Sequence, residues 1–437
     1  MKKKIMCAIL SLMAVLSLSA CTTKEVASDS GEGSADKQVI TCGAIVLDPA
    51  VEMEIVRFNK LNDTYEIQVR DYGEEANLDE EAAIRQLNFD IINNSGPDIL
   101  ILPVYYSMDL YAEKQVLEDL YPYLDSDEEL SKEDFLPNVM SAFERDGKLY
   151  GFPVSFDVDT MIGPSSLLGD KNSWTLEEMM DVVSGVDANT NFFENSSQSS
   201  VMNICVKANW SRFVTWQGDK FSFDKELYKQ ILEFTSRFPQ EQEYVHNQKY
   251  QERIMEKDLY VLDGSASVYH VSSDQIFNSL FKEQVTYIGY PTDGDSGSLI
   301  WSATTFSINS RSKNKDGAWE FIRTVLSKDY YERASFVRGF STRKDVLELQ
   351  LQEAKDGFVG MMIGEDFNLP EVKPVTQEEI ERIRQLVMSV DTMAMYDYEI
   401  TSIMLEEAAS YFQGYKSVDE VADMVENRIR IYVSEME

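Results

Sequence analysis

Apolar positions between residues 38 and 102 alternate between the spacing of strands and the spacing of helices. Short apolar runs with strand character are separated by stretches in which apolar residues recur on one helical face. The strand-like runs are 39–46, 65–69 and 98–102, and the helical positions are Val51, Ile55 and Phe58, then Ile84, Leu87 and Ile91. This β-α-β-α-β order predicts a largely parallel sheet covered by helices.

Local signals place further helices and turns along the chain. Asp48 is a natural N-cap, and Pro49 suits the first helical position that follows it. Capping boxes are expected at Thr175 with Glu178, Thr376 with Glu379, and Ser417 with Glu420. Asp146-Gly147 and the segment 216–221 predict hairpins, so the body mixes helices and strands and the tail from about residue 371 is helical.

The N-terminus has the layout of a cleavable signal. Lys2 to Lys4 precede an apolar run over 5–18. This run is too short to span a bilayer, which takes a helix of about 20 residues. The small residues before Cys21 resemble the lipobox of bacterial lipoproteins, which implies that 1–20 is removed and that Cys21 is lipidated. The alternative is an ordinary secretory signal with an incidental cysteine. Residues 21–37 then form the lipid-anchor cysteine and a flexible tether of small and polar residues.

Charge and length limit the partners and the architecture. A formal charge of −36 argues against nucleic acid and against anionic membrane surfaces, so we expect membrane contact only through the anchor, and a monomer. The 400 residues after the tether are more than one hydrophobic core normally supports, which predicts two lobes. Cys42 and Cys205 remain as two isolated buried thiols or as one disulfide.

Several short motifs along the chain carry a family resemblance. They include Arg57-Phe58-Asn59, Gly96-Pro97-Asp98-Ile99, the segment 116–124, Asp146–Tyr150, Tyr290-Pro291-Thr292 and the segment 314–322. Together with the lipobox, their order resembles the extracellular solute-binding lipoproteins of bacterial ABC transporters, in the group that usually binds carbohydrates. The resemblance implies a ligand, a mono- or oligosaccharide, and ABC permease subunits as partners, on the extracytoplasmic face of the cell membrane.

The resemblance also implies the fold class, which is α/β with two periplasmic-binding-protein-like lobes. Each lobe would be a mostly parallel sheet flanked by helices, followed by a helical C-terminal region. The expected division is 38–155 for the first part of lobe I, 156–285 for lobe II, 286–370 for the return segments of lobe I and the hinge, and 371–437 for the C-terminal helices.

Candidate ligand contacts follow the ends of strands, since ligands of parallel sheets bind outside the carboxyl ends of strands and between domains. Asp48 follows the first strand and would either accept hydrogen bonds from sugar hydroxyls or only cap its helix. Tyr105 and Tyr106 follow the third strand, and one of them would line the cleft. Phe156 precedes Asp157 and Asp159 where the chain enters the second lobe.

Alternation places Asp157 and Asp159 on one face of a strand, where paired carboxylates suit hydroxyls or a cation; the alternative is a solvated face. Trp301 follows a Gly- and Ser-rich loop and precedes a strand, so it is our candidate for stacking on a sugar. The alternative is that Trp301 is a core residue that covers the hinge. The other tryptophans, Trp174, Trp210, Trp216 and Trp319, are expected to be structural.

The sequence contains no convincing catalytic, metal or cofactor motif. Gly294-Asp295-Ser296-Gly297 is similar to a serine-protease motif, but His246 and His270 lack the surrounding motifs such enzymes show. Two histidines and no cysteine cluster argue against a zinc site, and there is no P-loop. We therefore expect no enzyme, no metal and no cofactor. A surface glycoside hydrolase, which needs only two carboxylates, and a lipoprotein binding a peptide or another protein stay open as alternatives.

Overall fold

A computed structural model describes residues 37–103, 108–186, 191–217, 220–240, 250–256, 259–266, 273–302, 304–334, 339–355, 374–394 and 398–435. The chain divides into two units, 1–36 and 37–437, and the structure described below is that of the second. Cys21 and the signal-like segment lie outside the described residues, as do Tyr105, Tyr106, His246 and His270.

The first sheet contains the three strands that the N-terminal pattern predicts. Its order is β2 (Tyr65–Asp71), β1 (Gln38–Ala44), β3 (Ile99–Leu102), β13 (Thr305–Ile308) and β6 (Phe152–Pro153). β1 is parallel to β2 and β3, as expected, whereas β13 is antiparallel to β3 and β6. All four residues of β3 are buried, which explains why its sequence is a continuous apolar run.

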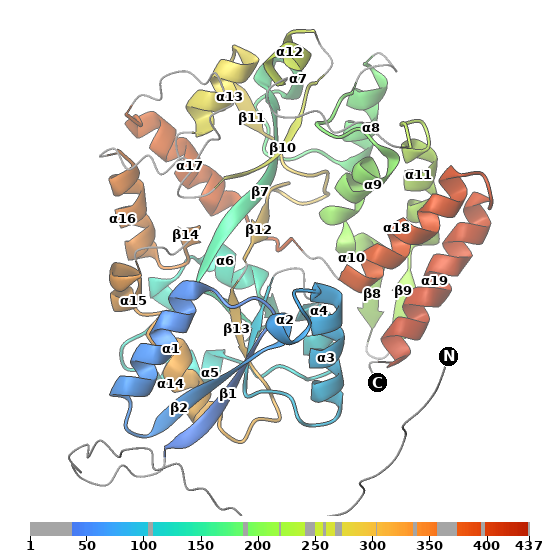
Figure 1. The fold of residues 1–437 in the computed structure, drawn as a ribbon. Coiled ribbons are helices and arrows are strands. Elements are labelled where there is room, and N and C mark those ends of the chain that lie inside the picture. Colours follow the sequence, from blue (N-terminus) through green and yellow to red (C-terminus); the bar gives the residue numbers. More distant parts are fainter. Residues whose placement is uncertain are drawn as a thin grey trace, which may run out of the picture. The chain divides into compact units, whose positions relative to one another are not determined.

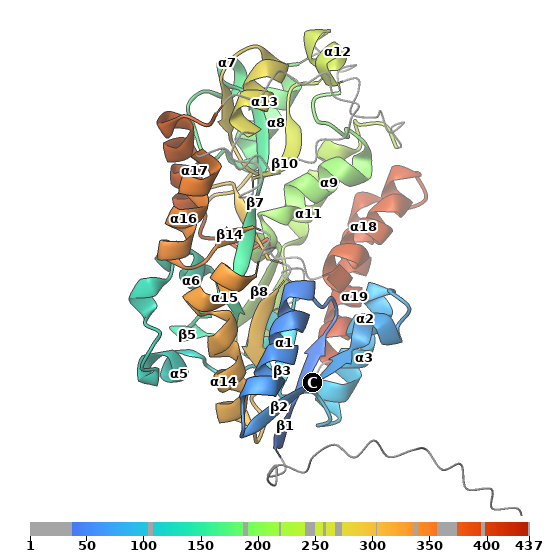
Figure 2. The same ribbon diagram turned by 60° about the vertical axis from the view of Figure 1, so that its left-hand side comes forward.

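Helices cover both faces of this sheet (Figures 1 and 2). The chain moves from β1 to β2 through α1 (Pro49–Leu61) and then back past β1 to β3 through α3 (Glu80–Ile92). Right-handed crossovers in opposite directions place these two helices on opposite faces. Phe58 of α1 meets Phe321 of α14 (Lys315–Val325) with ring centroids 5.3 Å apart, so α14 lies beside α1.

The second sheet is built around one long strand, β7 (Ser155–Pro164), and here the expectation of a mostly parallel sheet was wrong. Four strands pair with β7, and every one of them is antiparallel to it. These partners are β10 (Leu262–Ala266), β11 (Val285–Tyr287), β12 (Leu299–Trp301) and β14 (Phe340–Ser341). Apolar alternation identifies a strand but carries no information on its direction, which is set by the connections.

Two antiparallel strand pairs confirm the predicted hairpins. The first joins β4 (Glu144–Arg145) to β5 (Lys148–Leu149) through Asp146 and Gly147, with φ angles of 53° and 75°. Both values belong to the type I′ turn that favours Asp-Gly. The second pairs β8 (Val214–Gln217) with β9 (Lys220–Phe223).

The C-terminal region is helical, as predicted. It comprises α17 (Gln377–Ser389), α18 (Tyr398–Phe412) and α19 (Val418–Glu435). The capping boxes at Thr376 and Ser417 both form. The pair α18–α19 packs on α9 (Gln198–Lys207) and α11 (Lys225–Thr235), where Tyr228 donates a hydrogen bond to the Met404 carbonyl at 2.7 Å.

The other helices are mostly shorter, and several of them pack on the strands of the second sheet. They are α2 (Tyr72–Glu75), α4 (Met108–Glu113), α5 (Tyr121–Ser126), the 3₁₀ turn η1 (Lys132–Asp134), α6 (Pro137–Ala142), α7 (Ser165–Leu168), α8 (Leu176–Ser184), α10 (Trp210–Phe213), α12 (Tyr250–Met255), α13 (Ser273–Phe281), α15 (Lys328–Arg333) and α16 (Lys344–Lys355). The capping box of Thr175 and Glu178 opens α8, and this helix ends before Gly185, as predicted.

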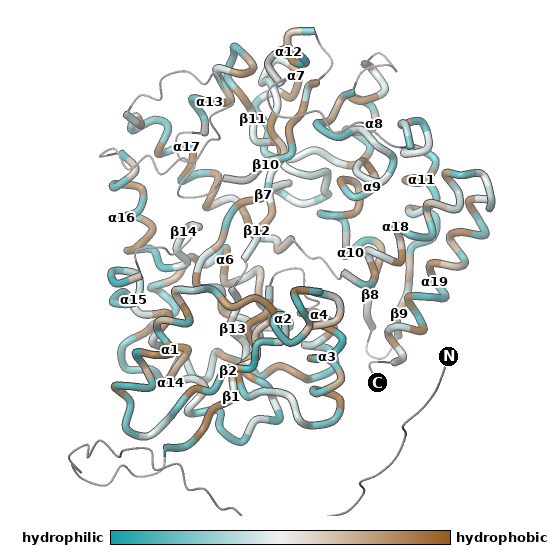
Figure 3. Tube along the Cα trace, viewed as in Figure 1, coloured by the Kyte–Doolittle hydropathy of each residue, from teal (hydrophilic) through white to brown (hydrophobic). Residues whose placement is uncertain are grey.

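Apolar side chains fill the space between the sheets and their helices. Figure 3 shows helices such as α17 and α19 changing between hydrophobic and hydrophilic residues along their length, as expected for helices with one packed face. Cys42 in β1 and Cys205 in α9 are both free and fully buried, which decides against the disulfide alternative. Trp174 and Trp319 are buried and donate hydrogen bonds to the Gly289 carbonyl and to Asp127, so both are structural, as predicted.

Candidate binding site beside the strands that join the lobes

Three chain segments meet where the first sheet passes into the second. Val154 lies between β6 and β7, Thr304 lies between β12 and β13, and Thr342 follows β14. The Val154 N–H donates to the Thr304 carbonyl at 3.4 Å, and the Thr342 hydroxyl donates to the Val154 carbonyl at 3.1 Å. The Tyr331 hydroxyl donates to the same carbonyl. The first residues of β7 and the last residue of β12 are therefore fixed next to the joint between the lobes.

Trp301 and Asp157 lie directly opposite each other in this region. They form a Cα pair in the antiparallel ladder between β12 and β7, and both side chains are partly exposed. Residues that face each other in such a ladder project to the same side of the sheet, as do residues two apart on a strand. Asp159 therefore shares this side with Trp301 and Asp157. The alternation of β7 predicted that Asp157 and Asp159 share a side, but not that Trp301 lies there too.

Asp159 is bound to a lysine from a different element. Lys207, the last residue of α9, places its Nζ 2.9 Å from Asp159 Oδ2 and 2.8 Å from the Tyr290 hydroxyl. The same ammonium lies 4.3 Å from the centroid of the Tyr290 ring. The side chains of Lys207 and Asp159 keep 16% and 19% of their surface exposed, so the pair is shielded but reachable by a polar ligand.

Tyr290 holds this pair in place from below the surface. Its hydroxyl donates to Asp263 on β10 while accepting from Lys207. Burial raises the pKa of Tyr290 well above its ordinary value, and the charges of Asp263 and Asp159 raise it further. The phenol therefore stays protonated and able to donate at any physiological pH. Lys207, Asp159 and Tyr290 form a fixed set of donors and acceptors beside Trp301.

Phe156 does not belong to this side of the sheet, which corrects its inclusion among the site residues. It is 1% exposed, pairs with Phe340 of β14 and packs against that ring at 6.0 Å between centroids. The reason is the alternation of β7, because a residue next to Asp157 projects to the opposite side. Phe156 is part of the hydrophobic core.

Asp48 confirms its expected role as a helix cap. Its Oδ1 accepts a hydrogen bond of 2.7 Å from the Ala50 N–H, and the carboxylate remains partly exposed after the end of β1. Capping and ligand binding are compatible, since the cap occupies one oxygen. A contact between Asp48 and a ligand stays a prediction.

Lys207 and Tyr290 were not among the residues that the sequence suggested as site residues. Lys207 meets Asp159 across 48 positions of the chain and Tyr290 across 83. No spacing rule connects residues so far apart. The only local signal in the sequence is that Lys207 is the one charged residue of the segment Gln198–Lys207, at its last position.

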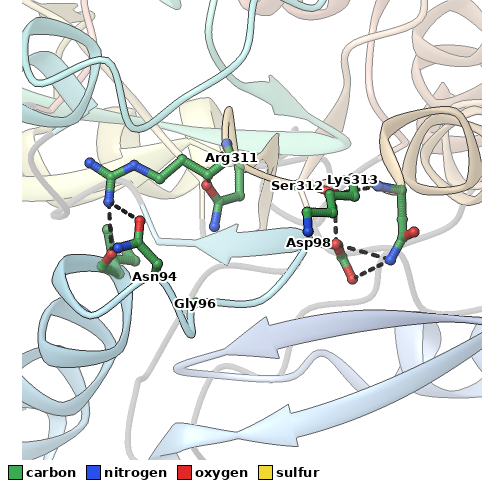
Figure 4. A pocket seen from close by; sticks show the side chains of 9 residues that line it. Asn94, Gly96, Asp98, Arg311, Ser312 and Lys313 are labelled. Atoms are coloured by element: carbon green, nitrogen blue, oxygen red, sulfur yellow. Dashed lines mark hydrogen bonds between the residues drawn. The ribbon is translucent and has the colours of Figure 1, made fainter.

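A separate pocket lies at the other edge of the first sheet (Figure 4). It has a volume of about 230 Å³ and is lined in part by Asn94, Asp98, Arg311 and Ser312. Asp98 precedes β3, so this pocket lies at the amino ends of the parallel strands, opposite to Asp48. Asp98 accepts hydrogen bonds from Thr41 and Ser312, and Arg311 donates to Asn94, so these groups join the elements around the pocket.

The part of the chain that the structure describes offers neither a metal site nor a membrane-spanning helix. No group of three or more His, Cys, Asp or Glu residues there could hold a metal ion. No described helix combines the length and apolar character that crossing a bilayer requires. Ser296, of the Gly-Asp-Ser-Gly segment, is 4% exposed, and its hydroxyl accepts a hydrogen bond from the Ser298 N–H.

Solved structures of other proteins have a similar fold. The chain is similar to the sugar-binding protein MalE from Xanthomonas citri, with 15% identity, a TM-score of 0.55 and coverage of 91% of this chain and 98% of that one. A periplasmic oligogalacturonide-binding protein from Yersinia enterocolitica matches with 12% identity, a TM-score of 0.56 and coverage of 91% and 100%. The substrate-binding protein Lmo0181 from Listeria monocytogenes, solved with cycloalternan, matches with 13% identity, a TM-score of 0.51 and the same coverage. The two-lobed α/β fold is thus that of periplasmic binding proteins.

The family comparison agrees with the fold. A search of curated proteins found no match. The family model described as bacterial extracellular solute-binding protein matches residues 55–355, which includes β7, β12, Lys207 and Tyr290. This protein belongs to the bacterial extracellular solute-binding proteins.

Proposed function

We propose that this protein captures an extracellular carbohydrate beside the strands that join its lobes and delivers it to an ABC importer. The family supports capture of a solute outside the cytoplasm, and solved structures with the same fold include sugar-binding proteins. The observation on which the sugar proposal rests is the pairing of Trp301 with Asp157, next to Asp159 and Lys207.

This combination has the chemistry that a sugar needs. An indole presents a flat apolar surface to the C–H face of a pyranose, and its N–H can donate to a hydroxyl. Carboxylates accept hydrogen bonds from hydroxyls, and an ammonium donates to them. Because Tyr290 and the ion pair hold Lys207 and Asp159, binding does not have to order them. The site would bind and orient a solute, with no chemical step.

The N-terminal segment completes the proposal. Residues 1–20 would be removed as a signal peptide, and Cys21 would carry the lipid that keeps the protein at the outer face of the cell membrane. Residues 22–37 would be the tether, and the permease subunits of the importer would be the protein partners. The lobes would be divided at about residues 155 and 285, with 371–437 as the added helical region.

The direct test is thermal unfolding of the full-length protein in mild detergent against a panel of mono- and oligosaccharides. A ligand that binds only the folded state should add about 2.7 kcal/mol at 100 times its dissociation constant. Each stabilising sugar is then incubated with the protein and analysed for products. A stabilising sugar recovered intact supports the proposal. Turnover would assign a glycoside hydrolase instead, and stabilisation by peptides alone would assign a peptide-binding lipoprotein.

A further inference from the structure

One face of α9 stays accessible and leads away from the candidate site. Most of the helix is buried; apart from Ser200, the exposed or partly exposed residues are Ser199, Asn203 and Lys207. These residues are spaced four apart, so they lie on the same side of the helix. Lys207 ends this face and contacts Asp159 and Tyr290, which joins the polar face of α9 to the side of β7 that carries Asp157.

Asn203, one helical turn before Lys207, has hydrogen-bonding capacity that nothing in the described structure uses. Its Oδ1 is buried and has no hydrogen-bond partner among the described residues. Asn209, two residues beyond the helix, also has a buried Oδ1 without a partner, but its Nδ2 donates to the Cys205 and Pro291 carbonyls at 2.9 and 2.7 Å, so the protein itself holds that amide. Buried acceptors in native proteins almost always have a partner, which can be protein, solvent or ligand. The amide of Asn203 is therefore placed for a partner that the protein itself does not supply.

The positions form a row that is longer than one sugar ring. Trp301 and Asp159 are diagonal neighbours in the ladder, a relationship that separates residues by about 7–8 Å. Lys207 bonds to Asp159, and Asn203 lies about 6 Å from Lys207 along the axis of α9. A pyranose stacked on Trp301 could reach Asp159 and Lys207, but a second unit is needed to reach Asn203.

We propose that the binding site continues from Trp301 along α9, and that Asn203 hydrogen-bonds the second unit of a sugar chain. This inference rests on the proposed function, because it adds a subsite to the same site. A carboxamide accepts through Oδ1 and donates through Nδ2, so it can engage two adjacent hydroxyls without a charge. Asn203 then determines ligand length and the hydroxyl pattern of the second unit, while Trp301 holds the first.

Titration calorimetry on the full-length protein in mild detergent tests this inference. The probes are glucose, maltose and maltotriose, xylose with xylobiose, and glucose with cellobiose, so that each chain has its own monosaccharide as reference. We expect at least one disaccharide to bind ten times more tightly than its monosaccharide or more. Asn203→Ala should lower the affinity for that disaccharide about tenfold and leave the monosaccharide within twofold.

Two further variants keep the result interpretable. Asn172→Ala removes an exposed asparagine of the same lobe and should change neither affinity. Asn203→Asp has the same shape but loses the N–H donor, so it should also lower the affinity for the disaccharide selectively. This variant covers the case in which the alanine variant does not fold.

The outcomes separate this inference from the proposed function. Equal affinity for the monosaccharide and for longer chains, or unchanged disaccharide affinity in folded Asn203 variants, would overturn the α9 subsite and leave sugar binding intact. A lower melting temperature without a change in affinity would overturn it too, because Asn203 would then bind a structural water. Absence of binding by every sugar, including those of the wider panel above, would overturn both.

Discussion

Trp301 and Asp157 face each other across the ladder between β12 and β7, three residues from Thr304 and Val154, where the chain passes between the sheets. Their pairing unites the two kinds of contact that a sugar requires, an apolar platform and a hydroxyl acceptor, on one side of one sheet. Movement of one lobe relative to the other would change what covers this side, since the joint lies next to it. A solute held here would therefore couple binding to lobe closure.

Replacing Trp301 separates a stacking platform from a core residue. We expect Trp301→Ala to weaken sugar binding by about 2 kcal/mol, as the loss of an aromatic anchor does. Because the side chain is partly exposed, the free energy of unfolding should fall by less than the roughly 3–5 kcal/mol of a buried tryptophan. Calorimetry and denaturant unfolding measure the two effects, and Trp301→Phe should retain part of the affinity. Unchanged affinity in a folded alanine variant would remove Trp301 from the site.

The ion pair of Lys207 and Asp159 should also be measurable by itself. Both groups are largely shielded from solvent. In a double-mutant cycle on the free energy of unfolding, we therefore expect Lys207→Met and Asp159→Asn to give a coupling free energy of about 1–2 kcal/mol. The exposed pair of Lys328 and Glu332 serves as the control and should give about 0.5 kcal/mol or less. Equal couplings for the two pairs would mean that Lys207 and Asp159 are not fixed relative to each other.

The anchor proposal makes a prediction for Cys21. Cys21→Ser removes the only group that could be acylated at the end of the signal-like segment, so the variant should no longer partition into the detergent phase as the parent does. Mass spectrometry of the parent should show acyl chains on Cys21. A parent without acyl mass, together with unchanged partitioning of the serine variant, would contradict lipid anchoring.

The two buried thiols should be unreactive while the protein is folded. Burial raises the pKa of Cys42 to about 12, and burial also raises the pKa of Cys205. At pH 8 neither thiol forms appreciable thiolate, so a thiol reagent should label both only after unfolding of the Cys21→Ser protein. The stability that these neutral thiols contribute is complete below the unfolded pKa of about 8.5 and falls as pH rises toward the folded value. Rapid labelling of Cys42 or Cys205 in the native protein would contradict this.

Asp127 should make the stability of the first lobe sensitive to acid. Its burial opposes ionisation, but Arg323, the backbone N–H groups of Glu129 and Leu130, and Trp319 outweigh it and hold the pKa of Asp127 below its usual value. A lowered pKa means that the contribution is complete above about pH 4 and is lost as pH falls through the folded value.

Asp127→Asn should therefore lower the free energy of unfolding by about 2 kcal/mol at pH 7 and flatten its dependence on pH below 4. Denaturant unfolding between pH 7 and pH 2 measures both effects. Asp125→Asn is the control, because Asp125 is 58% exposed and pairs with Lys132 at the surface. An Asp127 variant as stable as this control would show that the network around Trp319 contributes little.

Much of the local structure could be predicted from the sequence because short-range interactions decide it. The cap of α1 by Asp48 and the box of Thr175 with Glu178 each involve residues at most three positions apart. Asp146-Gly147 forms its turn because these residue types tolerate positive φ angles. The three parallel strands of the first lobe followed from alternating helices and strands, since a parallel pair requires a crossover.

The site was predictable only in part. Alternation placed Asp157 and Asp159 on one side of a strand, and it should also have excluded Phe156 from that side. The pairing of Asp157 with Trp301 and the bond from Lys207 to Asp159 join segments that are remote in the sequence, so no local pattern contains them.

The sequence by itself determined where helices and strands begin, which faces are apolar and which residues can cap or turn, because these depend on neighbouring residues. Tertiary structure decided the antiparallel direction of every strand on β7, and it decided which polar groups meet at its side. The physical reason is that a strand edge offers the same N–H and C=O groups in both directions. Packing and connection lengths therefore choose between them, and they act only when the whole chain is folded.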